Sequence, residues 1–283
     1  MAEIELSEDF LLWIARLPKK KRKVYMQLVG RLEWQKCADD IFYWLDSTRH
    51  YFPYVYTLDP HPMNKCLLCK EDGATHSFNK RNIHLELVHK IKVETDGELR
   101  GYFVELPTTR VFTLHEYMKA IIKVWLNEQY VFVEKSRDMM MTWLAVAMYT
   151  WDTMFHEGRQ NIFQSEDAVK TLELVKRSWF IYEHQPRFLR EQKRVTFTQG
   201  AAKSGIFQVP ELNSEILGFP QGPDQIRQYH PSGVFQDEAA FQGQAGDSFS
   251  AIKPSIQNGG RFTAVSSANP SWFMIQCRDR SGE

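Results

Sequence analysis

The sequence has no long hydrophobic run, no net charge and few cysteines, and each absence argues against a class of protein. It contains no run of about 18 apolar residues, which a membrane-spanning helix requires. Its acidic start, MAEIELSEDF, lacks the pattern of a secretory signal. The 35 basic and 35 acidic residues balance, so contacts with nucleic acid must come from local patches. Four cysteines do not make a disulfide scaffold. We expect an intracellular protein without a membrane segment.

The hydrophobic pattern divides the chain into three segments. Residues 1–53 have helical periodicity, residues 54–110 are irregular, and residues 111–283 alternate between helix and strand patterns. The expected helices of the last segment are 116–126, 142–155 and 167–182, and the expected strands are 130–134, 161–164, 194–198, 206–209, 234–236 and 261–265. Such alternation predicts an α/β domain with a mostly parallel sheet flanked by helices.

Two adjacent acids, Asp237 and Glu238, follow an apolar run in the segment GVFQDEAAF. Acids at the end of a buried strand are unfavourable unless cations or hydrogen bonds compensate them. In a Walker B strand the first acid holds Mg²⁺, and the second orients and deprotonates the attacking water. The segment favours these roles over a surface turn with two solvated acids. Gln236 departs from the pattern, because its position is usually apolar.

A basic loop precedes the second expected helix of this segment. Its residues are Lys135, Ser136, Arg137, Asp138, Met139, Met140, Met141 and Thr142. A phosphate loop points backbone N–H groups at a polyphosphate, while a lysine neutralises charge and a hydroxyl binds Mg²⁺. Thr142 occupies the hydroxyl position, but methionines replace the usual glycine and lysine, and the cations stand at the start of the loop. By itself this segment fits either a phosphate loop or a basic turn before a buried helix.

Small polar residues follow the last expected strand. They are Ser266, Ser267, Ala268 and Asn269, and a proline comes next. Beside an acid-bearing strand, such residues can sense a γ-phosphate and transmit its loss to a moving part of the protein. The alternative is an ordinary Ser/Asn/Pro turn.

In this order, KSRDMMMTW, VFQDEAAF and SSANP resemble the ATPase part of the large terminase of tailed bacteriophages, the motor that packages DNA. That family often has a loop of the type KSRQxGxT/S, with its basic residue near the start. The intervening segments NIFQSEDAVKTLELVKRSWFIYEHQPRFL and NSEILGFPQGPDQIRQYHPSGVFQDEAAF are similar to the family as well. The resemblance covers residues 112–269 and implies a P-loop NTPase fold of the ASCE type.

The resemblance implies that ATP and Mg²⁺ bind this chain. Residues 135–142 would bind ATP, with phosphate contacts from Lys135 and Arg137. Thr142 and Asp237 would hold Mg²⁺, Glu238 would be catalytic, and residues 266–269 would form the coupling motif. Arg227 matches an arginine that some terminases supply in trans to a neighbouring subunit; the alternative is a solvated loop arginine.

The implied function is ATP-driven translocation of viral double-stranded DNA into a procapsid, in the cytoplasm of the infected host cell. The implied partners are DNA, the portal and procapsid, the small terminase subunit, and further copies of the chain in a ring. The family normally continues into an RNase H-like nuclease domain, whose carboxylate cluster is missing from this sequence. We therefore expect no nuclease activity from this chain, and either a fragment or a split-gene product with a separate nuclease chain. Met140 stands at the position of the family's loop glycine, and its side chain would affect how closely the backbone can approach phosphate.

A possible metal module lies in the irregular segment. Cys66, Cys69, His84 and His89 have the spacing C-x2-C-x14-H-x4-H, which suits tetrahedral Zn²⁺. His76 is a competing ligand. We predict a zinc-finger-like insertion, against the alternative of two buried thiols and unrelated histidines.

A basic run, Pro18 to Val24, has three readings. It has the form of a nuclear localisation signal, it fits a patch for DNA phosphates, and it fits a charged helix face.

Two functions compete with the packaging motor. One is a helicase-like ATPase, and the other is a DNA- or protein-binding adaptor whose nucleotide site does not hydrolyse ATP.

Overall fold

The computed structural model describes residues 8–47, 54–58, 91–95, 98–102, 109–137, 139–199, 205–257 and 259–279. The chain forms two compact units, of which the first comprises Met1–Val55 with Thr113–Glu283 and the second Tyr56–Phe112. The four zinc ligands, the competing His76 and Asp138 lie outside the described residues. The zinc-finger-like insertion and the three-segment division therefore stay predictions.

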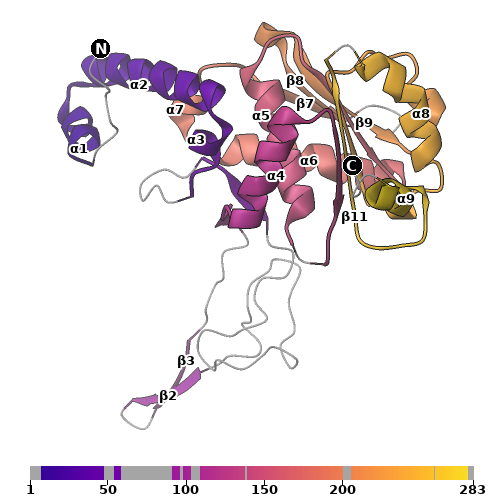
Figure 1. Cartoon of the computed structure of the whole chain (residues 1–283). Coiled ribbons are helices and arrows are strands. Elements are labelled where there is room, and N and C mark those ends of the chain that lie inside the picture. The colour runs from indigo at the N-terminus through magenta and orange to yellow at the C-terminus, as the bar shows by residue number, and fades with distance from the viewer. Residues whose placement is uncertain are drawn as a thin grey trace. The chain divides into compact units, whose positions relative to one another are not determined.

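A seven-stranded sheet forms the centre of the first unit (Figure 1). Its strand order is β5-β11-β10-β6-β9-β8-β7. The bounds are β5 Tyr130–Glu134, β6 Gln160–Ser165, β7 Thr196–Gln199, β8 Gly205–Val209, β9 Ser214–Pro220, β10 Gly233–Asp237 and β11 Arg261–Ser266. The first five strands of this order are parallel, and β8 and β7 are antiparallel to their neighbours. This is the mostly parallel sheet that the alternating pattern predicts.

Helices cover both faces of the sheet (Figure 1). Tyr149 of α5 (Met141–Phe155) contacts Phe163 and Phe235, whereas Phe249 of α8 (Ala245–Ile256) contacts Phe132 and the neighbouring strand. Side chains alternate between the two faces of a strand, so α5 and α8 lie on opposite faces. The other helices of this region are α4 Glu116–Asn127, α6 Ala168–His184, α7 Arg187–Arg190 and α9 Trp272–Asp279, with 3₁₀ turns η1 Pro210–Leu212, η2 Pro223–Gln225 and η3 Ala239–Phe241.

The helix α5 is buried over almost its whole circumference. One side packs on the sheet, and the other contacts the amino-terminal helices α2 Lys19–Asp39 and α3 Ile41–Leu45. The first helix, α1 Glu8–Arg16, packs on α2. Phe155 at the end of α5 lies 4.6 Å from Trp34 and 5.8 Å from Trp44 between ring centroids. Trp151 donates a hydrogen bond of 2.6 Å to the Cys37 carbonyl. A helix that is apolar all round requires such cover on both sides.

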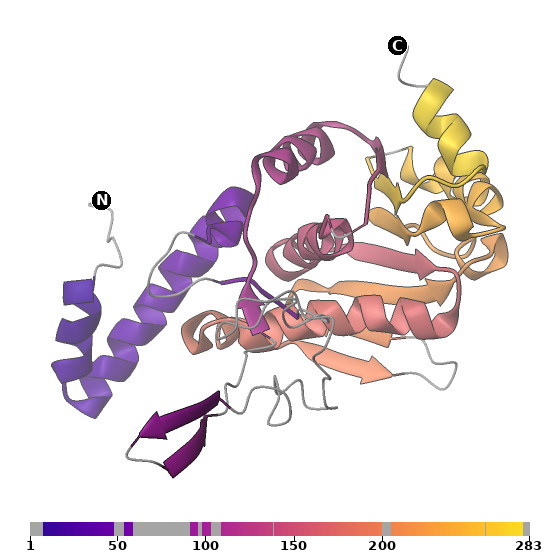
Figure 2. The ribbon, with the colours of Figure 1, turned by 90° about the horizontal axis from the view of Figure 1, so that it is seen from below.

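The amino-terminal helices are joined to residue 54 by one buried carboxylate. Glu33 is 1% exposed and accepts hydrogen bonds from the hydroxyls of Tyr43 (2.6 Å) and Tyr54 (2.5 Å). The helical prediction for this part of the chain is confirmed over residues 8–45. In Figure 2 these indigo helices and the yellow carboxyl-terminal helix lie at opposite ends of the unit.

The second unit contains two short antiparallel pairs. β1 Tyr56–Leu58 pairs with β4 Thr109–Val111, and β2 Ile91–Thr95 pairs with β3 Glu98–Tyr102. The irregular pattern of residues 54–110 did not predict these strands.

Among the described residues of the chain, no helix is both long and apolar enough to cross a membrane.

The predicted helices and strands of the last segment are confirmed, with small shifts of their ends. Three of the larger elements were not predicted: the strand β9, which pairs with β6 and β8, and the helices α8 and α9. β9 has the sequence SEILGFP, whose glycine and proline are typical of a turn. Gly218 lets α6 pack closely on this strand, because a Cβ at this position would lie 3.0 Å from the side chains of Thr171 and Val175 on α6.

Candidate active site

The three sequence motifs meet at one edge of the sheet. The predicted phosphate loop follows β5, the two acids end or follow β10, and the small polar residues end or follow β11. These strands are parallel, and β11 lies between the other two. Their carboxyl ends therefore point the same way. The backbone N–H of Lys135 donates to the Ser266 carbonyl at 2.9 Å, which joins the first motif to the third.

Asp237 is a buried acid held by a hydroxyl. Its side chain accepts a 2.9 Å hydrogen bond from the Thr142 hydroxyl, which lies in the first turn of α5. Burial raises the pKa of Asp237 to about 6, because desolvation disfavours the carboxylate. The Thr142 hydrogen bond and the charges of Arg177 and Lys135 lower this pKa, while the neighbouring acid Glu238 raises it.

The pair Thr142–Asp237 has the donor chemistry that Mg²⁺ prefers. Mg²⁺ binds oxygen ligands, and in nucleotide sites it takes only one or two protein ligands beside phosphate and water. The 2.9 Å separation of the two oxygen atoms allows both to reach one ion. In the described part of the chain, no group of three or more His, Cys, Asp or Glu residues forms an all-protein metal cage. The residues present thus fit an ion that is shared with a substrate.

Glu238 is the second acid, and it lies in a turn. Its φ of 51° and ψ of 44° are left-handed, so the chain turns sharply between β10 and η3. One carboxylate oxygen forms an ion pair with the Lys135 ammonium at 2.8 Å. The other accepts from the hydroxyls of Ser266 (3.3 Å) and Ser267 (3.5 Å). Residues of all three motifs therefore touch this single carboxylate or its neighbour Asp237.

Residues of the small polar motif contact the turn that carries the acids. The Ser266 hydroxyl accepts from the backbone N–H of Ala240 at 3.1 Å. The Asn269 side chain donates to the Ala240 carbonyl at 2.9 Å. Ala268 is exposed. Three of the four predicted coupling residues thus contact the acid-bearing turn directly.

The loop between β5 and α5 has the backbone shape expected at a glycine. Met140, which precedes α5, has φ 53° and ψ 18°, a left-handed conformation that is unfavourable for residues with a Cβ. The Tyr117 hydroxyl of α4 holds the adjacent Met139 carbonyl at 3.0 Å. Met141 is buried, whereas the side chain of Met140 is exposed. The loop therefore keeps a turn suited to glycine without having a glycine.

The remaining predicted residues lie apart from the acids. The side chains of Ser136 and Arg137 are exposed at the start of the loop. Arg227 is also exposed, with 63% of its side chain accessible, and its guanidinium donates to Asp224 at 3.1 Å. An exposed arginine on a turn is compatible with a role toward another molecule, and no contact joins it to Asp237 or Glu238 among the described residues.

Arg177 of α6 belongs to the site, although no sequence pattern pointed to it. Its guanidinium carbon lies 5.3 Å from the centre of the Trp143 ring, next to Thr142 in the chain. Burial lowers the pKa of Arg177, and the charge of Asp237 raises it. Of the cations that lower the pKa of Asp237, Arg177 has the larger effect and Lys135 the smaller. Among the described residues, no acid forms a hydrogen-bonded pair with Arg177.

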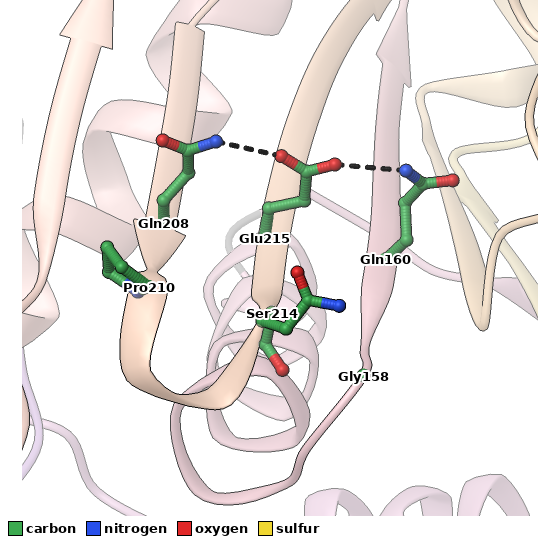
Figure 3. A pocket seen from close by; sticks show the side chains of 7 residues that line it. Gly158, Gln160, Gln208, Pro210, Ser214 and Glu215 are labelled. Carbon is green, nitrogen blue, oxygen red and sulfur yellow. Dashed lines mark hydrogen bonds between the residues drawn. The ribbon is translucent and has the colours of Figure 1, made fainter.

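A separate cavity of about 460 Å³ lies where β6 and β9 begin and β8 ends (Figure 3). It is lined by Gly158, Gln160, Gln208, Pro210, Asn213, Ser214 and Glu215. Glu215 accepts from the amides of Gln160 (2.9 Å) and Gln208 (3.0 Å), so both of its oxygens are occupied. This lining contains no cation to bind a phosphate. The cavity does not compete with the first site for a nucleotide.

No model of a known protein family matches this chain, and no curated protein matches it. Several solved structures resemble it, and these are large terminases of bacteriophages. The HK97 large terminase is 11% identical with a TM-score of 0.49, covering 61% of this chain and 37% of its own. The ATPase domain of the Thermus phage P74-26 large terminase is 13% identical with a TM-score of 0.45, covering 58% and 69%. The large terminase of another thermophilic bacteriophage, in complex with ATP-gamma-S, is 12% identical with a TM-score of 0.40, covering 58% and 41%.

Proposed function

We propose that this chain is an ATP-hydrolysing motor subunit of the large-terminase type, which translocates viral double-stranded DNA into a procapsid. The supporting observation is the convergence of four side chains at one sheet edge. Thr142 binds Asp237 at 2.9 Å, and Lys135 binds Glu238 at 2.8 Å. This set contains a hydroxyl and an acid for Mg²⁺, a cation for phosphate, and an acid for water. ATP hydrolysis needs these four groups in one place.

In this proposal Thr142 and Asp237 hold Mg²⁺, which neutralises phosphate charge when it is bound. The N–H groups at the start of α5 face the phosphates, since a helix of this length presents free donors and a positive dipole end there. Lys135 leaves Glu238 and contacts a phosphate oxygen of ATP. The carboxylate that Lys135 releases is then free to act as a base.

Glu238 orients a water molecule and takes its proton as the water oxygen attacks the γ-phosphorus. The bond between that phosphorus and the β–γ bridging oxygen breaks, ADP keeps the bridging oxygen, and inorganic phosphate forms. Ser266 and Ser267 already donate to Glu238, so the change of charge at this carboxylate reaches them directly. Through Ser266 and Asn269 it reaches the backbone of Ala240. This path is our proposal for coupling.

The DNA-packaging part of the proposal is supported by the order of the motifs and by one exposed basic surface. The five cations Lys19 to Lys23 occupy the first turns of α2 and are exposed. No acid balances them in the first turn, although a helix amino-terminus favours acids there. A DNA backbone would supply the missing negative charge.

The proposed assembly is a ring of copies at the portal of a procapsid, with the small terminase subunit and a nuclease chain as further partners, in the host cytoplasm. Arg227 would reach the nucleotide of a neighbouring copy. Its exposure and its weak surface pair with Asp224 leave it free to move.

Glu238→Gln tests the proposal. The variant keeps the size and a hydrogen-bonding side chain but cannot accept a proton, so ATP binding should persist while hydrolysis falls by about a hundredfold or more. The matched control is Glu116→Gln, at an exposed acid of α4 that pairs with Lys119. Its activity should equal that of the wild type.

Both measurements need Mg²⁺, DNA and the partner chains. If the wild-type protein binds ATP under these conditions but never hydrolyses it, the motor proposal is wrong and the non-hydrolysing adaptor is favoured. If Glu238→Gln hydrolyses ATP at the wild-type rate, the role of Glu238 is wrong.

We also propose that Cys66, Cys69, His84 and His89 bind one Zn²⁺ ion, on the basis of their spacing. Metal analysis of the purified protein tests this: one zinc per chain is expected, and the amount should fall in Cys66→Ser. A wild-type protein with clearly less than one zinc per chain contradicts the proposal.

A further inference from the structure

Three glutamines are buried behind the acid-bearing strand. Gln164 lies near the end of β6, Gln236 lies in β10 directly before Asp237, and Gln242 follows η3. The exposed fractions of Gln164, Gln236 and Gln242 are 0%, 0% and 4%. Buried amides of this kind require hydrogen-bond partners, so each contact indicates what the group holds.

Gln164 and Gln236 bind each other across neighbouring strands. The Gln236 amide nitrogen donates to the Gln164 side-chain oxygen at 2.8 Å and lies 3.4 Å from the Ala245 carbonyl. The polar residue that departs from a normal Walker B pattern is therefore half of a buried pair. The pair joins β10 to β6 and reaches the first residue of α8.

Gln242 connects this pair to the turn that carries Asp237 and Glu238. Its amide nitrogen donates to the Asp237 carbonyl at 2.7 Å and lies 3.5 Å from the Gln164 carbonyl. The proposed Mg²⁺ ligand thus has a side-chain contact through Thr142 and a backbone contact through Gln242.

The other end of the pair holds the segment that leads to Arg227. The Gln164 amide nitrogen donates to the Pro220 carbonyl at 3.0 Å and lies 3.4 Å from the Gly222 carbonyl. The backbone N–H of Gly222 donates to the Ser248 hydroxyl at 3.2 Å. η2 follows at once, and after it come the fully buried Ile226 and the exposed Arg227. The glutamines therefore lie between Asp237 and the base of the Arg227 turn.

The three glutamines form this network in a place where apolar side chains would be the usual choice. The side-chain oxygens of Gln236 and Gln242 are buried, and neither has a hydrogen-bond partner among the described residues. Unpaired buried oxygens are rare in native proteins, and apolar residues of similar volume avoid their desolvation.

We propose that Gln164, Gln236 and Gln242 are positioning residues that link the nucleotide state at Asp237 to the segment 220–227 and hence to Arg227. The inference rests on the proposed function, because it needs a nucleotide at Asp237. When a ligand at Asp237 shifts the end of β10, Gln242 and Gln236 transmit the shift to Gln164, and Gln164 moves the carbonyls of Pro220 and Gly222. Each copy thereby adjusts the arginine that it offers to the next.

The double variant Gln164→Leu/Gln236→Leu tests the link. It removes both partners of the central hydrogen bond together, so neither is left unpaired and the core stays filled. We expect it to fold and to bind ATP with unchanged affinity. Hydrogen exchange should show that ATP-gamma-S with Mg²⁺ changes the protection of residues 220–230 in the wild type, and that this change is lost in the double variant. ATP turnover by the assembled protein should fall by about tenfold.

Two further variants make the test sharper. Gln242→Met removes the contacts with the Asp237 and Gln164 carbonyls and keeps the central pair. It should lose the same exchange response even if the double variant does not fold. Gln208→Leu is the matched control, because it removes a glutamine contact at the opposite edge of the sheet. It should keep the response.

The outcomes separate the inference from the proposed function. A nucleotide-dependent exchange response that is lost in the variants, in a protein that never hydrolyses ATP, supports the link and overturns the motor. Normal ATP hydrolysis with an exchange response that all variants retain overturns the link and leaves the motor intact. A wild-type protein that binds no nucleotide overturns both.

Discussion

Lys135 and Glu238 form an ion pair across the candidate active site, with the ammonium nitrogen 2.8 Å from a carboxylate oxygen. The lysine follows β5 and the acid follows β10, and β11 lies between these strands. The pair therefore joins the proposed phosphate loop to the turn that carries Asp237 and Glu238, and each group balances the charge of the other. In the proposed reaction these two groups must separate, because the lysine is needed at phosphate and the acid at water.

Lys135→Met should weaken ATP binding by about tenfold or more, because a charge-assisted contact to phosphate is lost while the apolar stem is kept. Titration with a fluorescent ATP analogue measures this. Lys119→Met, at an exposed lysine of α4 that pairs with Glu116, is the control and should bind like the wild type. Equal affinities of the wild type and Lys135→Met would show that this lysine does not bind phosphate.

Met140→Gly should stabilise the protein by about 1 kcal/mol or leave it unchanged, because the left-handed backbone at this position is strained for a residue with a Cβ. Met140→Val should destabilise it, since a β-branched side chain fits this conformation less well. Denaturant unfolding of the three proteins gives the order. A marked loss of stability in Met140→Gly would show that the exposed methionine side chain contributes more than the backbone strain costs.

The sequence pattern identified the residues of the candidate site that stand next to each other in the chain. Asp237 and Glu238 follow an apolar strand, and Thr142 follows a basic loop, so their pattern and order are visible without a structure. The methionine-rich loop fitted either a phosphate loop or a basic turn, because the residue types show that the usual glycine is missing but do not give the backbone angles. The left-handed Met140 shows that the turn is retained.

Features that depend on contacts between distant segments were not predicted. The strand β9 contains a glycine and a proline, and only the approach of α6 explains Gly218. Gln236 looked like an exception, because its partner Gln164 lies on another strand. Arg177 sits among ordinary helix residues, and only the fold brings its charge near Asp237.

The stability of the wild type should fall between about pH 4 and pH 6 relative to Asp237→Asn. The pKa of Asp237 is raised from 3.8 to about 6 by burial, so the folded state binds a proton more tightly than the unfolded state. This contribution is fully present below pH 3.8 and is lost as the pH rises through 6. A pKa that is higher by about 2 in the folded state than in the unfolded state corresponds to roughly 3 kcal/mol of unfolding free energy.

Denaturant unfolding of both proteins at a series of pH values, without Mg²⁺, measures this difference. The contributions of acids that do not interact with Asp237 are the same in the two proteins and cancel. A difference in unfolding free energy that stays constant from about pH 4 to about pH 8 would contradict the raised pKa of Asp237.

Arg177→Gln should destabilise the protein at about pH 8 but much less at about pH 5. Arg177 lowers the pKa of Asp237, so its positive charge favours the ionised acid that is present at the higher pH. Without it, Asp237 keeps its proton to a higher pH, and the decline of stability extends further upward. The expected cost at the higher pH is roughly 1 kcal/mol, below the ~4 kcal/mol of two unit charges 4 Å apart at an effective dielectric constant of about 20, because no hydrogen bond joins Arg177 to Asp237 among the described residues.

A double-mutant cycle isolates this interaction. In the Asp237→Asn background, Arg177→Gln should have the same small effect at both pH values, because no charge is left for the arginine to stabilise. Lys176→Gln, at the neighbouring exposed residue that pairs with Glu173, is the matched control and should have no pH-dependent effect in either background. If Arg177→Gln remains equally destabilising at both pH values, its contribution comes from packing on Trp143, and its charge does not act on Asp237.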